Sequence, residues 1–257
     1  MNLIDVILTA IVEGITEFLP ISSTGHMILL NHLLGDGDDY FSRTFIVFIQ
    51  LGAILAIVLL YARRFLFNIG VYFRLFVAFI PSAIVGALLY DFIKTHLFNP
   101  MVVAWALIIG GVILIILDKR LPQRDPEADE LSDMTYRRAF FIGLFQCLSV
   151  IPGVSRAAAT MIGGMSNGLS KKGAAEFSFL LAIPTMAAAT GYDLLKFEGH
   201  LTYVQWEFLG IGFVVAFLTA LLVVKWFIHL LDKHGFSIFG YYRILVGVIF
   251  LLFAKNW

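Results

Sequence analysis

Long apolar runs alternate with short polar segments along almost the whole chain. Six runs are uninterrupted, and each is long enough to cross a hydrocarbon core of about 30 Å as a helix. They lie at roughly 44–62, 71–90, 101–117, 174–195, 208–231 and 238–254. Two further apolar regions, at about 3–34 and 139–166, are interrupted in the middle. The pattern predicts an all-α integral membrane protein with six full transmembrane helices.

Both interruptions begin with a proline. The first reads PISSTG from Pro20, and the second reads PGVSR from Pro152. Proline ends the preceding helix, and a serine or threonine just after it can cap a new one. Non-helical backbone is tolerated at membrane depth only where it is buried in protein or lines a wet cavity. Each interrupted region is therefore expected to be a re-entrant hairpin of two half-helices.

The two halves of the chain resemble each other in three places, always in the same order. GITEFL from Gly14 matches GLFQCL from Gly143, QLGAILAI from Gln50 matches EFSFLLAI from Glu176, and WALIIGGVILII from Trp105 matches YRILVGVIFLLF from Tyr242. Each half then holds one hairpin and three spans. Because three is odd, the second copy enters the membrane from the opposite side, which produces an inverted-topology repeat.

This duplication divides a single membrane domain into two repeats and a connector. The repeats cover residues 1–118 and 139–257, and a charged, proline-containing connector covers 119–138. Basic residues fix the orientation, because cytoplasmic loops are enriched in Lys and Arg. The side that holds the termini receives four of the 18 Lys and Arg residues, and the other side receives thirteen, Arg243 among them. The connector should therefore be cytoplasmic, and the termini and the opening of any site should face outward.

Composition supports this assignment and narrows the function. The chain is 60% hydrophobic and 14% charged, with a mean hydropathy of +0.90, which excludes an ordinary soluble domain. A formal net charge of zero gives no basic surface for nucleic acid. Cys147 is the only cysteine, so an intrachain disulfide is excluded and a cysteine metal cage is not expected. The first residues lack a basic n-region and a cleavage site, so we expect them to form mature helix.

Two carboxylates occupy the first interrupted region. Glu13 and Glu17 are four residues apart and share one helical face. Ionisable groups at this depth are costly and usually functional. Such a pair suits a divalent cation, Mg²⁺ or alternatively Ca²⁺, shared with substrate phosphate oxygens. The alternative is a protonated, hydrogen-bonded pair that fixes helix packing.

The polar residues that follow predict an anion site. Ser22, Ser23, Thr24 and Gly25 open a half-helix, whose backbone N–H groups and positive dipole end favour anions. Ordinary capping is the alternative role for these hydroxyl groups. His26, on the first turn, is a candidate nucleophile or proton carrier.

The second break supplies a positive charge. Ser155 and Arg156 open the equivalent half-helix, and a buried arginine needs a partner. Glu13, Glu17 or a bound diphosphate could serve, and a structural Arg–Glu bridge is the alternative. Buried polar residues expected to support this site are Gln50, Gln146 and Glu176. Together these groups suit hydrolysis of a phosphoanhydride, where positioning and charge neutralisation do most of the catalysis.

The motifs EGITEFLPISSTGH and PGVSRAAAT resemble the two signature motifs of the bacterial undecaprenyl-diphosphatase family, which is linked to bacitracin resistance. The resemblance extends over essentially the whole chain. It implies an inner-membrane hydrolase that removes one phosphate from undecaprenyl diphosphate with a divalent cation, regenerating the lipid carrier of peptidoglycan synthesis. The family's essential residues would fall on Glu13, Glu17, Ser23, His26 and Arg156. Family members usually have Ser-Gly where this chain has Ala157 and Ala158, which affects any contact made through those two positions.

Several alternatives stay open at this stage. Ser23 could attack phosphorus with His26 as its base, His26 could attack directly, or water could attack without a covalent intermediate. Inverted repeats with broken helices are also typical of transporters, so a polyprenyl-phosphate flippase is the alternative function. Besides its lipid substrate and the surrounding membrane lipids, the protein is expected to contact a second copy of itself in a homodimer formed through the outer spans.

Overall fold

The computed structural model describes residues 1–34, 40–62, 69–97, 99–121, 130–196 and 199–253, and all of the regular elements in these residues are helical. The helices are α1 (Leu3–Thr16), α2 (Ser23–Leu34), α3 (Tyr40–Leu60), α5 (Ile69–Phe92), η1 (Ile93–Leu97), α6 (Pro100–Arg120), α7 (Glu130–Asp133), α8 (Tyr136–Gln146), η2 (Cys147–Val150), α9 (Arg156–Ser166), α10 (Lys171–Leu195), α11 (Tyr203–His234) and α12 (Ser237–Phe253).

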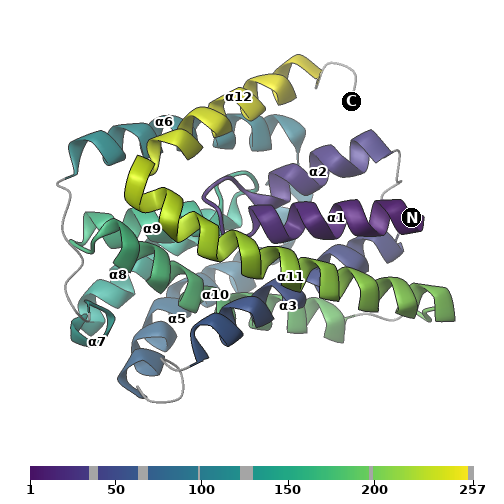
Figure 1. Cartoon of the computed structure of the whole chain (residues 1–257), viewed down its shortest axis with the longest axis horizontal. Coiled ribbons are helices and arrows are strands. Elements are labelled where there is room, and N and C mark those ends of the chain that lie inside the picture. The colour runs from purple at the N-terminus through teal and green to yellow at the C-terminus, as the bar shows by residue number, and fades with distance from the viewer. Residues whose placement is uncertain (35–39, 63–68, 98, 122–129, 197–198, 254–257) are drawn as a thin grey trace.

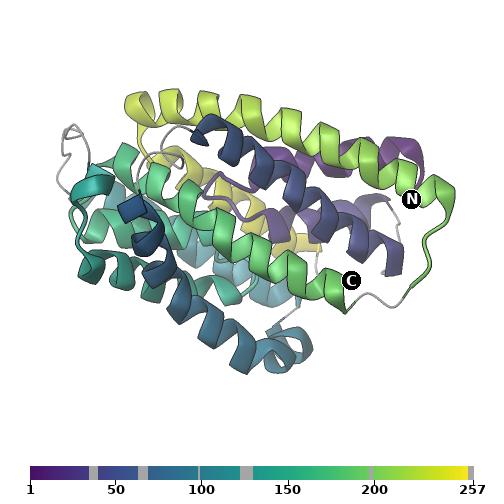
Figure 2. The same cartoon turned by 90° about the horizontal axis from the view of Figure 1, so that it is seen from below.

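Five of these helices are long and apolar enough to cross a membrane: α3, α5, α6, α10 and α11. They correspond to five of the six predicted spans, with ends that differ by a few residues. The sixth predicted span, 238–254, corresponds to α12, whose 17 described residues lie at the lower limit for a membrane-spanning helix. At 1.5 Å per residue it rises only about 25 Å. The long helices run roughly along the horizontal axis in Figures 1 and 2.

The two interrupted regions fold as pairs of short helices. The α1–α2 pair packs together, and so does the α8–α9 pair. The N-terminal end of α1 and the C-terminal ends of α2 and α12 lie on the right in Figure 1, whereas α8 and α9 lie on the left. Packing between elements also recurs: α1 packs on α11 as α8 packs on α5, and α3 packs on α11 as α10 packs on α5.

Most of the described residues of the connector are exposed, but the segment is more ordered than a simple loop and has two buried residues. Residues 122–129 lie outside the described part of the chain, but the remainder is largely helical, with α6 extending to Arg120 and α7 formed within the connector. Leu131 and Met134 are buried in the main hydrophobic core. Arg74 of α5 donates a hydrogen bond to the Met134 carbonyl, which attaches this segment to the membrane domain.

Phenylalanines dominate the core beneath the first break. Phe18 meets Phe179 edge to face at a centroid distance of 5.7 Å, and Phe179 meets Phe227 at 5.9 Å. These rings join the end of α1 to α10 and α11. Such aromatic packing fixes the position of Glu17, which is adjacent to Phe18 in the chain.

Candidate active site

A cavity of about 200 Å³ lies where the two breaks meet. The first break contributes Glu17, Ser22, Ser23 and Thr24, and the second contributes Ser149, Ile151, Pro152, Gly153, Ser155 and Arg156. Gln50 of α3 and Thr185, Met186 and Ala189 of α10 complete the wall. The two interruptions therefore share one polar chamber, as the sequence predicted.

The same local conformation opens α2 and α9. Ser22 has φ 71° and Ser155 has φ 73°, a left-handed conformation that non-glycine residues rarely adopt. Ser22 Oγ accepts a hydrogen bond from the Gly25 N–H at 3.4 Å, and Ser155 Oγ accepts one from the Ala158 N–H at 3.1 Å. Each serine thus turns the chain sharply and caps the following helix. Backbone strain of this kind is concentrated at functional sites.

Glu17 joins the two breaks. Its Oε2 accepts a hydrogen bond from Ser23 Oγ at 2.6 Å, and its Oε1 contacts Arg156 Nη2 at 3.1 Å. Arg156 also donates from Nη1 to the Ser178 carbonyl at 2.9 Å, and its guanidinium lies 5.6 Å from the centre of the Phe18 ring. A hydroxyl, a carboxylate and a guanidinium from distant parts of the chain are therefore connected at the cavity wall.

Glu13 lies behind this wall. It is fully buried, and its two carboxyl oxygens make no hydrogen bond to the described part of the chain. Glu17, Gln50 and Arg156 are nevertheless close enough to act on its charge. A buried carboxyl group without a hydrogen bond is costly unless it is protonated or binds a ligand.

His26 does not line the cavity. Its Nδ1 lies 2.8 Å from the Ser22 carbonyl, and its Nε2 lies 2.8 Å from Tyr242 Oη. The two rings are stacked, with centroids 5.6 Å apart. Because a carbonyl only accepts, Nδ1 carries the proton and Nε2 is available to accept one from Tyr242. The pairing of Ser23 with His26, which was one of the alternatives, is not formed in this structure, since the Ser23 hydroxyl is directed to Glu17.

The remaining predicted residues take different positions. Gln146 donates to Ser82 Oγ at 2.5 Å and to Thr185 Oγ1 at 3.1 Å, so it contacts the cavity wall through Thr185. Glu176 is buried but does not line the cavity. Gly25 also lies outside the cavity wall and packs on α6, where an added Cβ would lie 3.3 Å from Val103.

Arg243 of α12 was missed as a site residue and assigned to the cytoplasmic side, and the structure corrects this. The side chain is fully buried and donates hydrogen bonds of 2.9–3.3 Å to five backbone carbonyls. The acceptors are Pro20 in the first break, Gly153 and Val154 in the second, and Ala106 and Leu107 in α6. One guanidinium therefore holds both breaks. The signal in the sequence was an arginine several residues inside an otherwise apolar helix.

Known proteins resemble this chain over nearly its full length. The sequence profile of the family described as bacitracin resistance protein BacA matches residues 6–249. The chain belongs to this family. BacA-family relatives named undecaprenyl-diphosphatase include one from Flavobacterium johnsoniae, 51% identical over 98% of this chain and 96% of the relative. Another from Aquifex aeolicus is 50% identical over 96% of both chains, and one from Bdellovibrio bacteriovorus is 48% identical over 98% of this chain and 96% of the relative. The family resemblance predicted from the two motifs is confirmed.

Proposed function

We propose that this protein hydrolyses undecaprenyl diphosphate to undecaprenyl phosphate and inorganic phosphate. The observation that carries the proposal is the contact of Glu17 with both Ser23 and Arg156 at a polar cavity among apolar helices. The relatives that match nearly the full chain are named for this activity. Such a reaction would recycle the lipid carrier of peptidoglycan synthesis and so support cell-wall growth and cell shape.

Arg156 is the main ligand for the diphosphate in this proposal. Its Nε makes no hydrogen bond to described residues, and the guanidinium lies at the cavity wall. A guanidinium can hold two phosphate oxygens at once. The N-terminal ends of α2 and α9 belong to helices of 12 and 11 residues, and Ser22, Thr24 and Ser155 at these ends line the same cavity. Their backbone dipoles favour the negative charge of the phosphates.

Ser23 is the nucleophile, and Glu17 is its base. The Ser23 hydroxyl passes its proton to Glu17 Oε2 as Oγ bonds to the terminal phosphorus, and the bond from phosphorus to the bridging oxygen breaks. Undecaprenyl phosphate leaves with that oxygen. Glu17 passes its proton on to the departing undecaprenyl phosphate. Water then attacks the phosphoserine while Glu17 takes a proton from the water, the bond from phosphorus to Ser23 Oγ breaks, Glu17 returns that proton to Oγ, and inorganic phosphate is released. Arg156 fixes the orientation of Glu17 and stabilises the charge that develops on the phosphoryl oxygens.

A divalent cation would be held by Glu13 and Glu17. The donor set fits Mg²⁺ or Ca²⁺, because both residues offer hard oxygen ligands and the Glu13 oxygens lack hydrogen bonds. Among the residues that the structure describes, no group of three or more His, Cys, Asp or Glu side chains is placed to hold a metal. Substrate oxygens and water would therefore complete the shell. When bound, the ion would neutralise charge on the phosphates.

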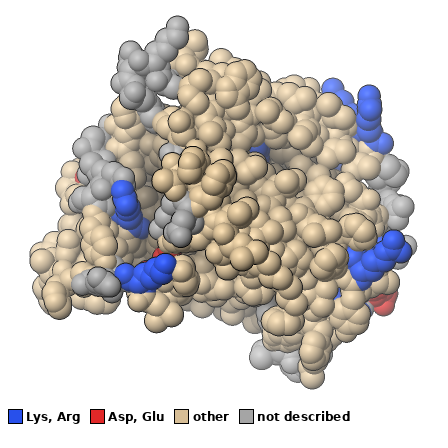
Figure 3. Space-filling view, turned by 180° about the vertical axis from the view of Figure 1, so that it is seen from behind, with Lys and Arg blue, Asp and Glu red and all other residues tan. Residues whose placement is uncertain are grey.

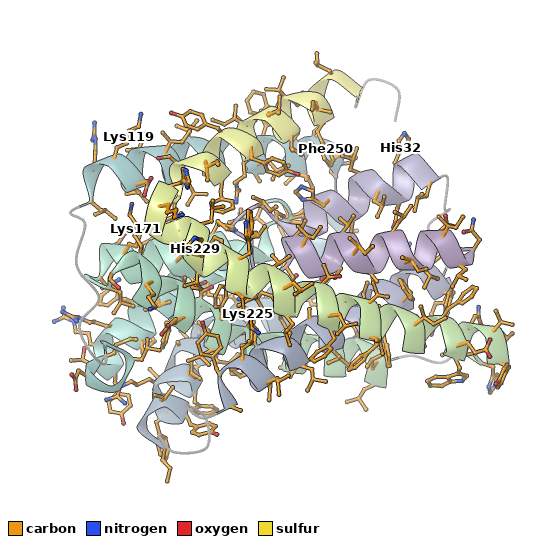
Figure 4. All side chains as sticks on the ribbon, in the orientation of Figure 1. His32, Lys119, Lys171, Lys225, His229 and Phe250 are labelled. Atoms are coloured by element: carbon orange, nitrogen blue, oxygen red, sulfur yellow. The ribbon has the colours of Figure 1, made fainter. Side chains whose placement is uncertain are left out.

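The proposed topology has six spans, with α12 as the sixth, and two re-entrant hairpins inserted from opposite sides of a bacterial inner membrane. The opposite placement of the α1–α2 and α8–α9 pairs supports it. Lys119 and Lys171 lie at one end of the molecule and His32 at the other (Figure 4). By the excess of basic residues, the end with Lys119 is cytoplasmic. The cavity is lined by residues in the C-terminal half of α10, which supports an opening toward the outer side.

A phosphate-release assay tests the proposal. Purified protein is mixed with undecaprenyl diphosphate, with Mg²⁺, Ca²⁺ or chelator added. The wild type should release phosphate and lose activity with chelator, and Ser23→Ala should be inactive while still folded. Glu207→Gln, an exposed change at the far end of α11, serves as control. Movement of lipid across vesicles without phosphate release would instead support the flippase alternative.

A further inference from the structure

A second, larger cavity lies beside the polar one and has an apolar wall. Its volume is about 590 Å³, and it runs between one face of α6 and the α8–α9 pair. Trp105 and Ile109 line it from α6, Leu148 from η2, Ile151 from the break that follows η2, and Ala158 from α9. None of its lining residues carries a charge. We call this space the α6–α9 groove.

The groove borders the candidate active site. Ile151 lines both cavities. Val154 lines the groove, and the next residue, Ser155, lines the polar cavity. The loop between Pro152 and Arg156 thus separates a phosphate-sized polar chamber on one side from an apolar channel on the other.

The groove is also open to the surrounding lipid. Ile109 is 55% exposed and Leu148 is 52% exposed, so in a membrane both side chains would contact lipid. A molecule with its head in the polar cavity could therefore keep its tail in the membrane while the nearest part of the tail lies in the groove. Ala158 adds a methyl group to the wall at a position where the family motif usually has glycine.

We propose that the α6–α9 groove binds the isoprenoid units next to the diphosphate, while the rest of the tail stays in the bilayer. This rests on the proposed function, and it assigns a tail site to residues that take no part in the chemistry. The bilayer is as apolar as the groove, so the gain comes from van der Waals packing and from orientation of the head. The groove therefore selects substrates by the shape of the tail near the head group.

Bulky substitutions with matched controls test this site. Ile109→Trp and Leu148→Trp fill the groove. As controls, Val112→Trp on α6 and Leu144→Trp on α8, which leads directly into η2, change apolar residues that are 42% and 43% exposed and do not line the groove. Phosphate release is measured with undecaprenyl diphosphate and with a five-carbon isoprenyl diphosphate, which has almost no tail to place.

The two groove variants should raise KM for the long substrate about tenfold, equivalent to the loss of a few well-packed methylene contacts. Their kcat/KM for the five-carbon substrate should equal that of the wild type. The control variants should have the wild-type kcat/KM with both substrates. Equal loss with both substrates, or equal loss in groove and control variants, would overturn the proposal. A wild type that releases no phosphate from either substrate would refute the proposed function instead.

A direct binding experiment tests the groove without relying on phosphate release. A polyprenyl phosphate that carries a photoreactive group on its second isoprene unit is activated with the protein in lipid nanodiscs. The label should attach to groove residues, and unlabelled polyprenyl phosphate should displace it while phosphatidylglycerol should not. Labelling elsewhere, or equal displacement by phosphatidylglycerol, would show that the groove holds ordinary lipid.

Discussion

The two carboxyl oxygens of Glu17 have different partners, and this difference explains how Glu17 can act as a base. Oε2 accepts from Ser23, and Oε1 faces Arg156. The guanidinium keeps the carboxylate oriented and balances its charge, while the other oxygen remains free to take a proton. Glu13 has neither partner, although it is one helical turn away. Two similar residues on one helix face therefore have distinct functions because of their surroundings.

The contact of His26 with Tyr242 leads to a prediction. If His26 positions the Ser22 turn and does not attack phosphorus, Tyr242→Phe should reduce kcat only about three- to tenfold, since one hydrogen bond contributes about 0.5–1.5 kcal/mol. The phosphate-release assay measures this, with the exposed neighbour Tyr241→Phe as control. Complete inactivation of Tyr242→Phe in a normally folded protein would place His26 in the chemical step.

Arg243 is expected to determine stability. Lysine has three donors, so Arg243→Lys leaves at least two of the five carbonyls without their present partner. Each lost partner at a buried site costs about 1–3 kcal/mol, so the free energy of unfolding should fall by at least about 2 kcal/mol. Denaturant titration in detergent micelles measures the change. The exposed change Arg120→Lys should have little effect on the free energy of unfolding. An equally small effect of Arg243→Lys would show that the five hydrogen bonds of Arg243 do not stabilise the fold.

At the scale of elements, the two half-helices begin with serines in the same rare conformation. Glycine adopts positive φ without strain, and replacing a capping serine by glycine costs only a few tenths of a kcal/mol. An alanine at position 155 removes the hydrogen bond that caps α9 and retains the strained left-handed backbone. Ser155→Ala should therefore lower the free energy of unfolding by about 1–2 kcal/mol, and Ser155→Gly should stay close to the wild type. Thermal unfolding followed by circular dichroism gives the order.

A contrasting order, with Ser155→Ala as stable as Ser155→Gly, would show that neither the left-handed backbone nor the cap matters at this break. Ser170→Ala and Ser170→Gly provide a comparison. Ser170 caps α10 through the Gly173 N–H at 3.0 Å, but its backbone is extended, with φ −63°. There the cap is present without the left-handed backbone, so the difference in stability between the alanine and glycine variants should be smaller at position 170 than at position 155.

The helices and breaks were largely predictable, because they depend on local features of the sequence: the length of each apolar run and the position of the prolines. Five spans and both breaks follow from the sequence, and so does the convergence of Arg156 with Glu17, since a buried charge needs a partner. The direction of the Ser23 hydroxyl toward Glu17 was not predictable, because it depends on side-chain orientation at a strained turn. Arg243 was assigned to the wrong place because it lies in the first half of its helix, on the side counted as cytoplasmic, whereas the five backbone carbonyls that bind it come together only in the folded bundle.

At the scale of the molecule, charged side chains lie toward the two ends, with a broad band of uncharged residues between them (Figure 3). This arrangement suits a protein surrounded by lipid. The association of two copies in a homodimer stays a prediction, which crosslinking in native membranes would test.

Orientation in the membrane can be measured directly. In a Cys147→Ser background, Tyr203→Cys and Lys119→Cys place single thiols at exposed positions at opposite ends of the bundle. A membrane-impermeant maleimide should label position 203 in intact spheroplasts and position 119 only after permeabilisation. The reverse pattern would contradict the outward-facing site.

Cooperation between the two breaks is tested most directly by a double-mutant cycle between Glu17 and Arg156 in the phosphate-release assay. Glu17→Gln and Arg156→Lys should each lower kcat/KM by about 10²–10⁴-fold, the range of a lost base or a lost charge stabiliser. Because the two groups act as one unit, the kcat/KM of the double variant should be only slightly below that of the less active single variant. Losses that multiply in the double variant would show that Glu17 and Arg156 act independently and would contradict a shared phosphate site.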